Sequence, residues 1–180
     1  MAVALIRFAD LPPSPWRNKA GRKADIAAAP GPAPSWTLGF AWLDADAPFS
    51  DFAGHDRTIT LVAGPGFTLH FADDTPDIVA DTPYRPHRFD GGRPTQCRIA
   101  GPCLVLNAMT DRGRHTHHVR VATGPDQANT AECPADFAVI LAGTSESPAA
   151  PHDTLRLARH TPLDLPAGTI AALIRFEAAL

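Results

Sequence analysis

The stretch Thr58-Ile-Thr-Leu-Val-Ala-Gly-Pro-Gly-Phe-Thr-Leu-His-Phe71 decides the fold class of this chain. Two runs rich in β-branched and apolar residues flank Gly64-Pro65-Gly66, where glycine accepts positive φ angles and proline cannot continue a strand ladder. This pattern predicts two strands that are joined as a β-hairpin.

Similar short runs recur along the rest of the chain, with turn-forming residues between them. They are Val3–Phe8, Trp36–Leu43, Gln96–Ile99, Cys103–Met109, His117–Ala122, Phe137–Leu141, Thr154–Ala158 and Thr169–Phe176. The segments Ala28–Ser35, Asp73–Gly92 and Gly143–Asp153 hold most of the prolines, and we expect them to be surface loops. Many short strands separated by turns indicate an all-β, antiparallel architecture.

The composition narrows the classes of function. The chain has 180 residues, 44% of them hydrophobic, and its net charge of −3 provides no broad positive field for nucleic acid or an anionic membrane. No run reaches the roughly 18 uninterrupted apolar residues of a membrane span. Arg7 interrupts the N-terminal apolar run, which is then too short for the apolar region of a signal peptide. We therefore expect a cytoplasmic protein without nucleic-acid or membrane partners.

The three cysteines carry no recognisable metal or disulfide pattern. Cys97, Cys103 and Cys133 are odd in number and are far from any CxxC spacing. We expect reduced thiols.

Arg57 is the most informative single position. In Asp56-Arg-Thr-Ile-Thr-Leu-Val62, strand alternation places Arg57, Ile59 and Leu61 on one face. If that face lines an interior, the guanidinium needs a carboxylate, because it stays protonated and its burial without a partner is costly. Three readings remain open: a salt bridge to an Asp such as Asp25 or Asp51, a strand-end side chain that reaches solvent, or a bidentate clamp on a ligand carboxylate.

A polar segment near the N-terminus is a second candidate. Trp16–Ile26 holds both lysines of the chain, Lys19 and Lys23, and reads as a loop that enters a strand near Asp25 and Ile26. An exposed basic loop anchored by a buried Trp16 is the simpler alternative to a ligand-binding loop.

Two histidines are the clearest metal candidates. His115 and His117 would share one strand face, and imidazole suits Zn, Fe, Ni or Cu. No carboxylate follows in Val119–Ala122, so we favour a solvated strand start over a metal site and expect no cofactor. Nucleophile elbows, phosphate loops and dinucleotide fingerprints are also missing from the sequence.

Three ordered segments carry motif-like patterns: Pro15–Ile26, Ala47–Arg57 and Gly101–Gly113, with Phe89-Asp90 before the third. Together they resemble the HutD/Ves family, named for a gene of bacterial histidine utilisation. Pro15–Ile26 is similar to the family's W-x-N-G-G-G-x-T-x-E-I, and Ala47–Arg57 to its G-P-F-S-x-F-P-G-x-D-R. Gly101–Gly113 is similar to D-x-N-x-M-x-R-R-G after a G-P turn, and Phe89-Asp90 fits the family's F-D-G element.

The resemblance implies a bicupin fold, that is, two fused small antiparallel β-barrels of jelly-roll type that share strands. Residues 1–180 would form one compact unit with approximate halves 1–110 and 111–180 and strand exchange between them. The implied role is non-catalytic binding of a small carboxylate, such as urocanate or a formylglutamate-like intermediate, that modulates histidine utilisation. A homodimer is compatible with this role.

The resemblance also implies a set of ligand-binding residues. Arg57 would act as the charge clamp, with Asn18 and Asn107 as orienting hydrogen-bond partners. The other matching or neighbouring motif positions are Asp25, Asp56, Lys19 and Lys23. Because Lys19 and Lys23 stand where the family has Gly and Thr, we hypothesise a more anionic ligand than is usual in the family.

Two rival readings remain. One is a metal-dependent cupin enzyme that uses His115, His117 and a third ligand. The other is a structural or protein-interaction module in which Arg57 is only salt-bridged.

Overall fold

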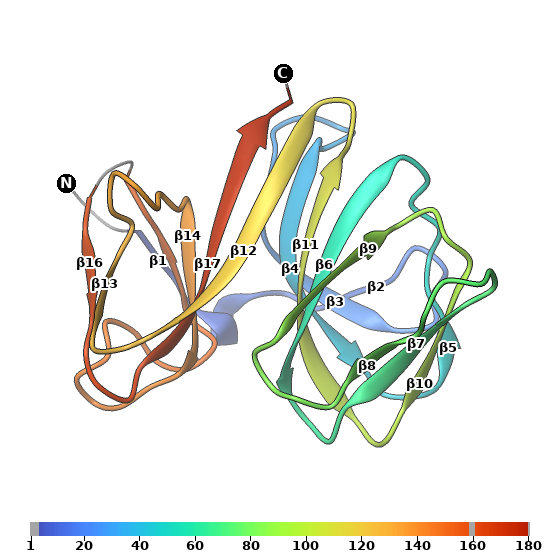
Figure 1. Cartoon of the computed structure of the whole chain (residues 1–180), viewed down its shortest axis with the longest axis horizontal. Coiled ribbons are helices and arrows are strands. Elements are labelled where there is room, and N and C mark those ends of the chain that lie inside the picture. Colours follow the sequence, from blue (N-terminus) through green and yellow to red (C-terminus); the bar gives the residue numbers. More distant parts are fainter. Residues whose placement is uncertain (1–3, 159–160, 180) are drawn as a thin grey trace. The chain divides into compact units, whose positions relative to one another are not determined.

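The structure, a computed structural model, describes residues 4–158 and 161–179. These residues form antiparallel β-strands, one short 3-10 helix at Phe8–Asp10 and no α-helix. Figure 1 shows the strands with their labels. The all-β, antiparallel architecture predicted from the sequence is confirmed.

The chain divides into two compact units. One contains Pro12–Thr116 and the described C-terminal residues Ala178 and Ala179, and the other contains His117–Glu177 together with the N-terminal segment up to Leu11. We call them the Pro12 unit and the His117 unit.

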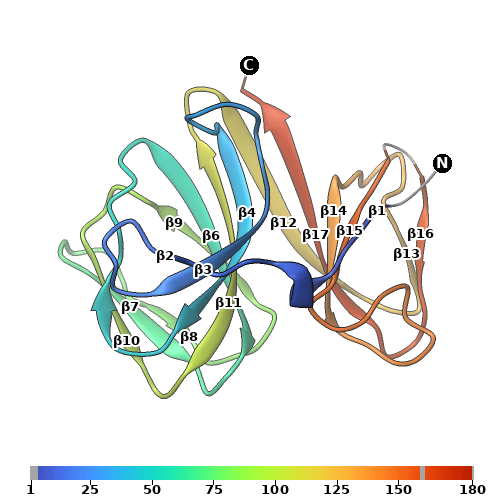
Figure 2. The ribbon, with the colours of Figure 1, turned by 180° about the vertical axis from the view of Figure 1, so that it is seen from behind.

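The Pro12 unit consists of two sheets that enclose one apolar core. The six-stranded sheet has the order β2 (Ser14–Pro15), β3 (Arg22–Ala28), β4 (Trp36–Leu43), β11 (Cys103–Asp111), β6 (His55–Ala63), β9 (Pro86–Asp90). The four-stranded sheet has the order β5 (Ala47–Pro48), β10 (Thr95–Ile99), β7 (Phe67–Phe71), β8 (Ile78–Ala80). Both sheets contribute to the core, for example Ile59 and Val105 from the first and Leu69 and Cys97 from the second. The outer strands β2 and β3 are seen best in Figure 2.

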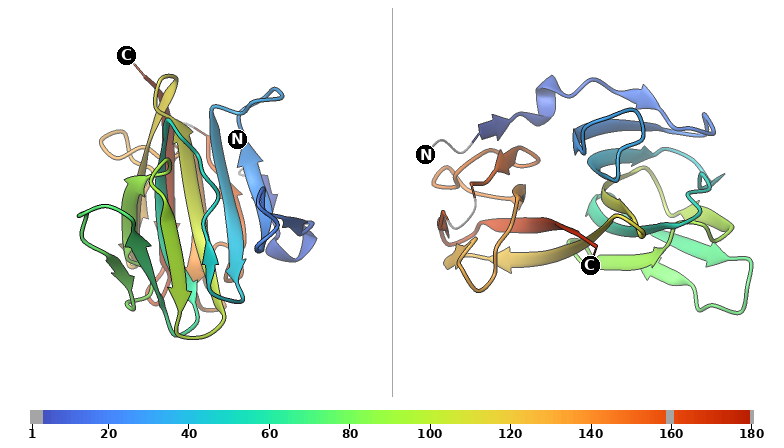
Figure 3. Two further views of the ribbon diagram at one scale, coloured as in Figure 1. Left: turned by 90° about the vertical axis from the view of Figure 1, so that its right-hand side faces the viewer. Right: turned by 90° about the horizontal axis from the view of Figure 1, so that it is seen from above.

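The His117 unit has a separate core. Its five-stranded sheet has the order β1 (Ala4–Ile6), β15 (Thr154–Arg156), β14 (Phe137–Ala142), β17 (Ile170–Ala178), β12 (His115–Thr123). A two-stranded sheet pairs β13 (Asp126–Ala128) with β16 (Leu163–Leu165). The adjacent long strands β12 (yellow) and β17 (red) are visible in the right view of Figure 3.

Each predicted strand contains or overlaps an observed strand, and some have the same first and last residues as the observed one. Trp36–Leu43 and Phe67–Phe71 are strands β4 and β7 as predicted. The predicted run at Val3–Phe8 contains β1, although Val3 lies outside the described residues.

The predicted hairpin at Gly64-Pro65-Gly66 is wrong. β6 pairs with β11 and β9 in one sheet, whereas β7 pairs with β10 and β8 in the other. The turn therefore carries the chain between sheets. Gly64 and Gly66 have φ angles of 110° and 113°, and a Cβ on Gly64 would lie 2.5 Å from the Pro102 carbonyl oxygen.

The prediction that Asp73–Gly92 is a surface loop is also wrong in part. It contains β8 and the edge strand β9, which pairs with β6 and places Phe89 opposite Arg57. The strand expected near Asp25 is present and begins at Arg22.

Among the described residues, no helix is long and apolar enough to cross a membrane.

Candidate functional site

Strand β6 carries Arg57 into the core of the Pro12 unit. Arg57 is 7% exposed, and Ile59 and Leu61 further along the same strand are fully buried. Met109 of β11 and Phe89 of β9 stand opposite Arg57 in the register. The inward position that strand alternation predicts for Arg57 is therefore confirmed.

Three phenylalanine rings surround the guanidinium of Arg57. Its Cζ atom lies 4.8 Å from the ring centre of Phe49, 5.0 Å from that of Phe89 and 5.6 Å from that of Phe52. Such contacts contribute about 0.5–2 kcal/mol each, with the larger values where water is excluded. We call these three rings the phenylalanine cage.

No carboxylate neutralises Arg57 among the described residues. Its hydrogen bond is a long one of 3.4 Å from a terminal nitrogen to Asn107 Oδ1, and its buried Nε has no partner. Asp25 is paired instead with Lys23, and Asp51 makes no ion pair within the part of the chain that the structure describes. The salt-bridge reading with Asp25 or Asp51 and the solvent-reaching reading are therefore both wrong.

Burial dominates the electrostatics of this position. Loss of water lowers the pKa of Arg57 to about 10, which still leaves the side chain charged at neutral pH. Burial raises the pKa of the nearby Cys97 thiol to about 12, so that thiol is neutral and supplies no compensating charge. The interior of the Pro12 unit thus holds one uncompensated positive charge.

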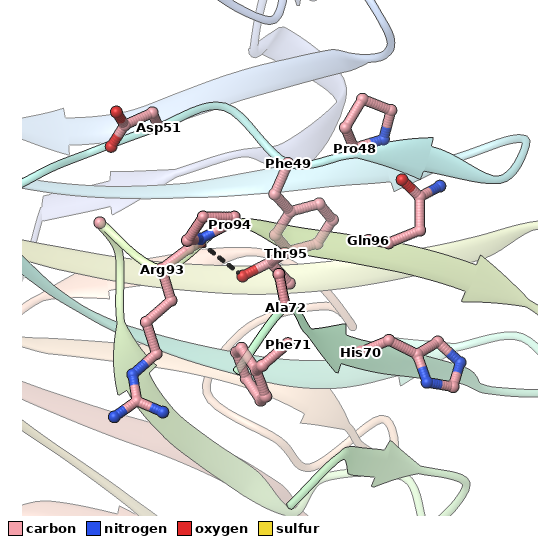
Figure 4. A pocket seen from close by; sticks show the side chains of 11 residues that line it. Pro48, Phe49, Asp51, His70, Phe71, Ala72, Arg93, Pro94, Thr95 and Gln96 are labelled. Carbon is pink, nitrogen blue, oxygen red and sulfur yellow. Dashed lines mark hydrogen bonds between the residues drawn. The ribbon is translucent and has the colours of Figure 1, made fainter. Parts of the chain in front are cut away.

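A pocket of about 510 Å³ lies next to the phenylalanine cage. Its lining includes Phe49, Phe71 and Thr95, with Arg93 and Asp51 toward one end and Gln96 toward the other (Figure 4). Phe49 belongs to both the pocket and the cage, whereas Phe52 and Phe89 do not line the pocket.

The acidic and basic side chains that line the pocket have different partners. Arg93 hydrogen-bonds to Thr75 and lies 3.4 Å from Asp73, and His70 Nδ1 lies 2.6 Å from Asp77. Asp51 has no ion-pair partner among the described residues. Arg93 and His70 at the pocket therefore each have an acidic neighbour, unlike Arg57.

Residues Trp16–Gly21, which we call the Trp16 loop, support the segment that carries Phe49. Asn18 Nδ2 donates to the Pro48 carbonyl at 2.9 Å, and Asn18 Oδ1 accepts from the Ala20 amide at 3.1 Å. The Trp16 ring meets the Phe49 ring edge-on at 5.8 Å and leaves no room for a Cβ at Gly21, which would lie 2.7 Å away. Asn18 thus holds the backbone of β5 beside Phe49.

The other predicted residues do not gather at Arg57. Lys23 Nζ is 2.7 Å from Asp25 Oδ1, and Lys19 is exposed with a φ of 59°. Asp56 points away from the Arg57 face, as alternation requires, and pairs with Arg88 at 2.6 Å and Arg112 at 2.9 Å. Of the seven predicted ligand-binding residues, the structure brings Arg57 and Asn107 into contact. Asn18 does not contact Arg57, but it binds the Pro48 carbonyl next to Phe49, whose ring contacts Arg57.

Sequence reasoning missed the rings that form the cage. Phe49 and Phe52 stand in the quoted G-P-F-S-x-F-like segment and Phe89 in the F-D element. No periodicity indicates that two loop aromatics and one aromatic of strand β9 converge on one side chain. Arg57 itself was the available signal, because a buried cation calls for aromatic or acidic neighbours.

The two metal candidates have different surroundings. His117 is 1% exposed and its ring lies 6.2 Å from that of Phe176, so the solvated strand start is wrong for His117. His115 has a buried Nδ1 without a partner. Within the described ranges, no three His, Cys, Asp or Glu side chains form a group that could hold a metal ion.

Comparison with known proteins identifies the family. The HutD family model matches residues 8–175. The chain belongs to the HutD family. An uncharacterised 21.2 kDa protein from the hutC 3′ region of Pseudomonas putida is 31% identical over 105 residues, which is 57% of this chain and 54% of that protein. The match thus spans about half the length of that curated relative.

Two solved structures share the fold over the whole chain. HutD from Pseudomonas fluorescens SBW25 has a TM-score of 0.78 at 23% identity, covering 99% of this chain and 100% of that one. The conserved protein of unknown function PA5104 from Pseudomonas aeruginosa PAO1 has a TM-score of 0.77 at 19% identity, with the same coverage.

The ion pairs of Asp56 lead to a prediction on pH dependence. Burial acts to raise the pKa of Asp56, but hydrogen bonds from Arg88 and Arg112 outweigh it and the pKa is lowered. Asp56→Asn should therefore reduce the free energy of unfolding at pH 7 by about 1 kcal/mol, measured by urea denaturation. The difference should be fully present above the unfolded pKa of about 3.9 and disappear as the pH falls through the lower folded value. Asp74→Asn, at an exposed position, is the control, and a difference that stays constant with pH contradicts the account.

The uncompensated charge leads to a second prediction. Arg57→Met keeps an unbranched chain against the phenylalanine cage and removes the buried charge, so the free energy of unfolding should stay equal or rise by about 1–2 kcal/mol. Chemical denaturation of Arg57→Met measures this difference. The control is Arg98→Met, which replaces an exposed arginine on β10. A loss of more than about 1 kcal/mol beyond the control would show that the guanidinium serves to stabilise the fold.

Proposed function

We propose that this chain is a cytoplasmic, non-catalytic binding protein whose ligand is a small organic carboxylate held by Arg57. One observation carries the proposal: the guanidinium is 7% exposed, has an unpartnered Nε, and faces no carboxylate among the described residues. A buried cation of this kind is costly for stability alone. A ligand carboxylate would supply the missing charge and the missing acceptor.

The chemistry of the guanidinium favours this class of ligand. Its N–H groups form a planar fork that matches the two oxygens of a carboxylate. Asn107 is already within 3.4 Å of a terminal nitrogen, so its amide can orient a group bound beside Arg57. In this proposal Asn18 acts through the backbone of Pro48, while Lys19, Lys23, Asp25 and Asp56 shape the surroundings without touching Arg57.

The family supports a narrower ligand class. The Pseudomonas putida relative is described by its position in the hutC 3′ region, and the matching family is HutD. We propose that the ligand is a carboxylate intermediate of histidine utilisation, such as urocanate or a formylglutamate-like compound, and that binding modulates that pathway.

Calorimetric titration tests the proposed function. The wild-type protein should bind urocanate and small carboxylates such as acetate and glutarate, and it should not bind acetamide, which lacks the charge. Arg57→Met should weaken carboxylate binding by about 30-fold or more, since removing one member of a buried charge pair costs roughly 2–5 kcal/mol.

Arg98→Met is the matched control, because it removes an exposed arginine that does not line the pocket. Its affinities should equal those of the wild type. Equal binding of acetate and acetamide, or undiminished binding in Arg57→Met, would refute the proposal.

A further inference from the structure

The phenylalanine cage closes Arg57 off from the pocket beside it. Arg57 is 7% exposed, so a ligand cannot reach the guanidinium unless a covering side chain moves. Of the three rings, Phe49 lies nearest to the Arg57 Cζ atom, at 4.8 Å, and it also lines the 510 Å³ pocket. The Phe49 ring is therefore the partition between open space and the buried charge.

The backbone at Phe49 is held on both sides, which limits how the ring can move. The Phe49 amide donates to the Thr95 carbonyl at 2.9 Å, and the preceding carbonyl of Pro48 accepts from Asn18. The ring itself is only partly buried. Opening by rotation of this side chain therefore breaks none of these backbone hydrogen bonds.

The route past Phe52 is less favourable. The guanidinium of Arg17 lies 5.8 Å from the ring centre of Phe52, and an Arg17 terminal nitrogen reaches the Asp51 carbonyl at 3.5 Å. Phe52 is thus covered by a second cation that would have to move with it. Phe89 is 9% exposed and belongs to the core of the Pro12 unit.

We infer that Phe49 is the gate residue of this site, and that the pocket beyond it receives the body of a ligand whose carboxylate reaches Arg57. The inference rests on the proposed function for the identity of the bound group. The pocket wall next to Phe49 includes Phe71 and Pro94, so the matching ligand carries an apolar or flat body behind its carboxylate. The carboxylate reaches Arg57 when the Phe49 ring rotates away, and the apolar body then gains affinity by lying against the pocket wall.

Chemical labelling tests the gate without any carboxylate. Phenylglyoxal modifies accessible guanidinium groups, and mass spectrometry of the Arg57 peptide measures the rate at that residue. Phe49→Ala, or Phe49→Leu if the first variant does not fold, should raise this rate by about tenfold or more, since labelling no longer waits for an opening. Adding Ala72→Trp, which fills the pocket from an exposed position, should return the rate toward that of the wild type.

Ala63→Trp is the control for the bulky substitution. Ala63 is exposed and lies six residues from Arg57 along β6, about 20 Å away. Adding Ala63→Trp to the Phe49 variant should leave the labelling rate of Arg57 in that variant unchanged. A Phe49 variant that labels like the wild type, or an Ala72→Trp addition without effect, would overturn the gate.

A ligand series tests the role of the pocket. In the wild type, affinity should rise by roughly three- to fourfold for each methylene from acetate to hexanoate, and this dependence should vanish in Ala72→Trp. The assignment of the pocket is overturned if affinity does not rise with chain length in the wild type, or if the same rise persists in Ala72→Trp. Labelling as expected without binding of any carboxylate would refute the proposed function and leave the gate standing, so the two failures are distinguishable.

Discussion

The burial of a guanidinium without an internal carboxylate is the constraint on which the Pro12 unit depends. Removing a charge from water costs several kcal/mol, and the protein offsets part of this cost with the faces of three phenylalanine rings. The pairing of β6 with β11 on one side and β9 on the other fixes the position of Arg57. The site is thus built into the sheet, where its geometry is set by the strand register.

The glycine at position 91 and the sequence motifs are related to the same constraint. A Cβ at Gly91 would lie 3.0 Å from Arg57 Cδ and 3.1 Å from the His55 carbonyl oxygen, so a side chain at this turn would press on the buried part of Arg57. Asp90 closes this turn by accepting from the Gly92 amide at 2.9 Å. The three segments that resemble the HutD family therefore converge: one supplies Arg57 and two rings, one supplies Asn107, and the Trp16 loop supports Phe49.

Local patterns predicted the β character and the inward Arg57, because β6 is a regular strand whose alternation is preserved. They failed at Gly64-Pro65-Gly66, since the same turn residues serve a hairpin and a crossing between facing sheets. What decides between the two is the occupation of both edges of β6 by β9 and β11, which come later in the chain. The pairing of Lys23 with Asp25 was accessible from sequence, because residues two apart share a strand face. The phenylalanine cage was not, because Phe49 and Phe52 lie in a loop and Phe89 on edge strand β9, and these segments meet only in the folded unit.

The most direct measurement of the central claim is the ¹⁵N–¹H NMR signal of Arg57 Nε, assigned by its loss in Arg57→Met. In the ligand-free protein this group has no acceptor, so its proton resonance should lack the downfield shift of a hydrogen bond to a carboxylate. Titration with acetate should move it downfield to saturation, while acetamide should leave it in place. A resonance already shifted in the free protein, or one that does not respond to carboxylates, would contradict the account.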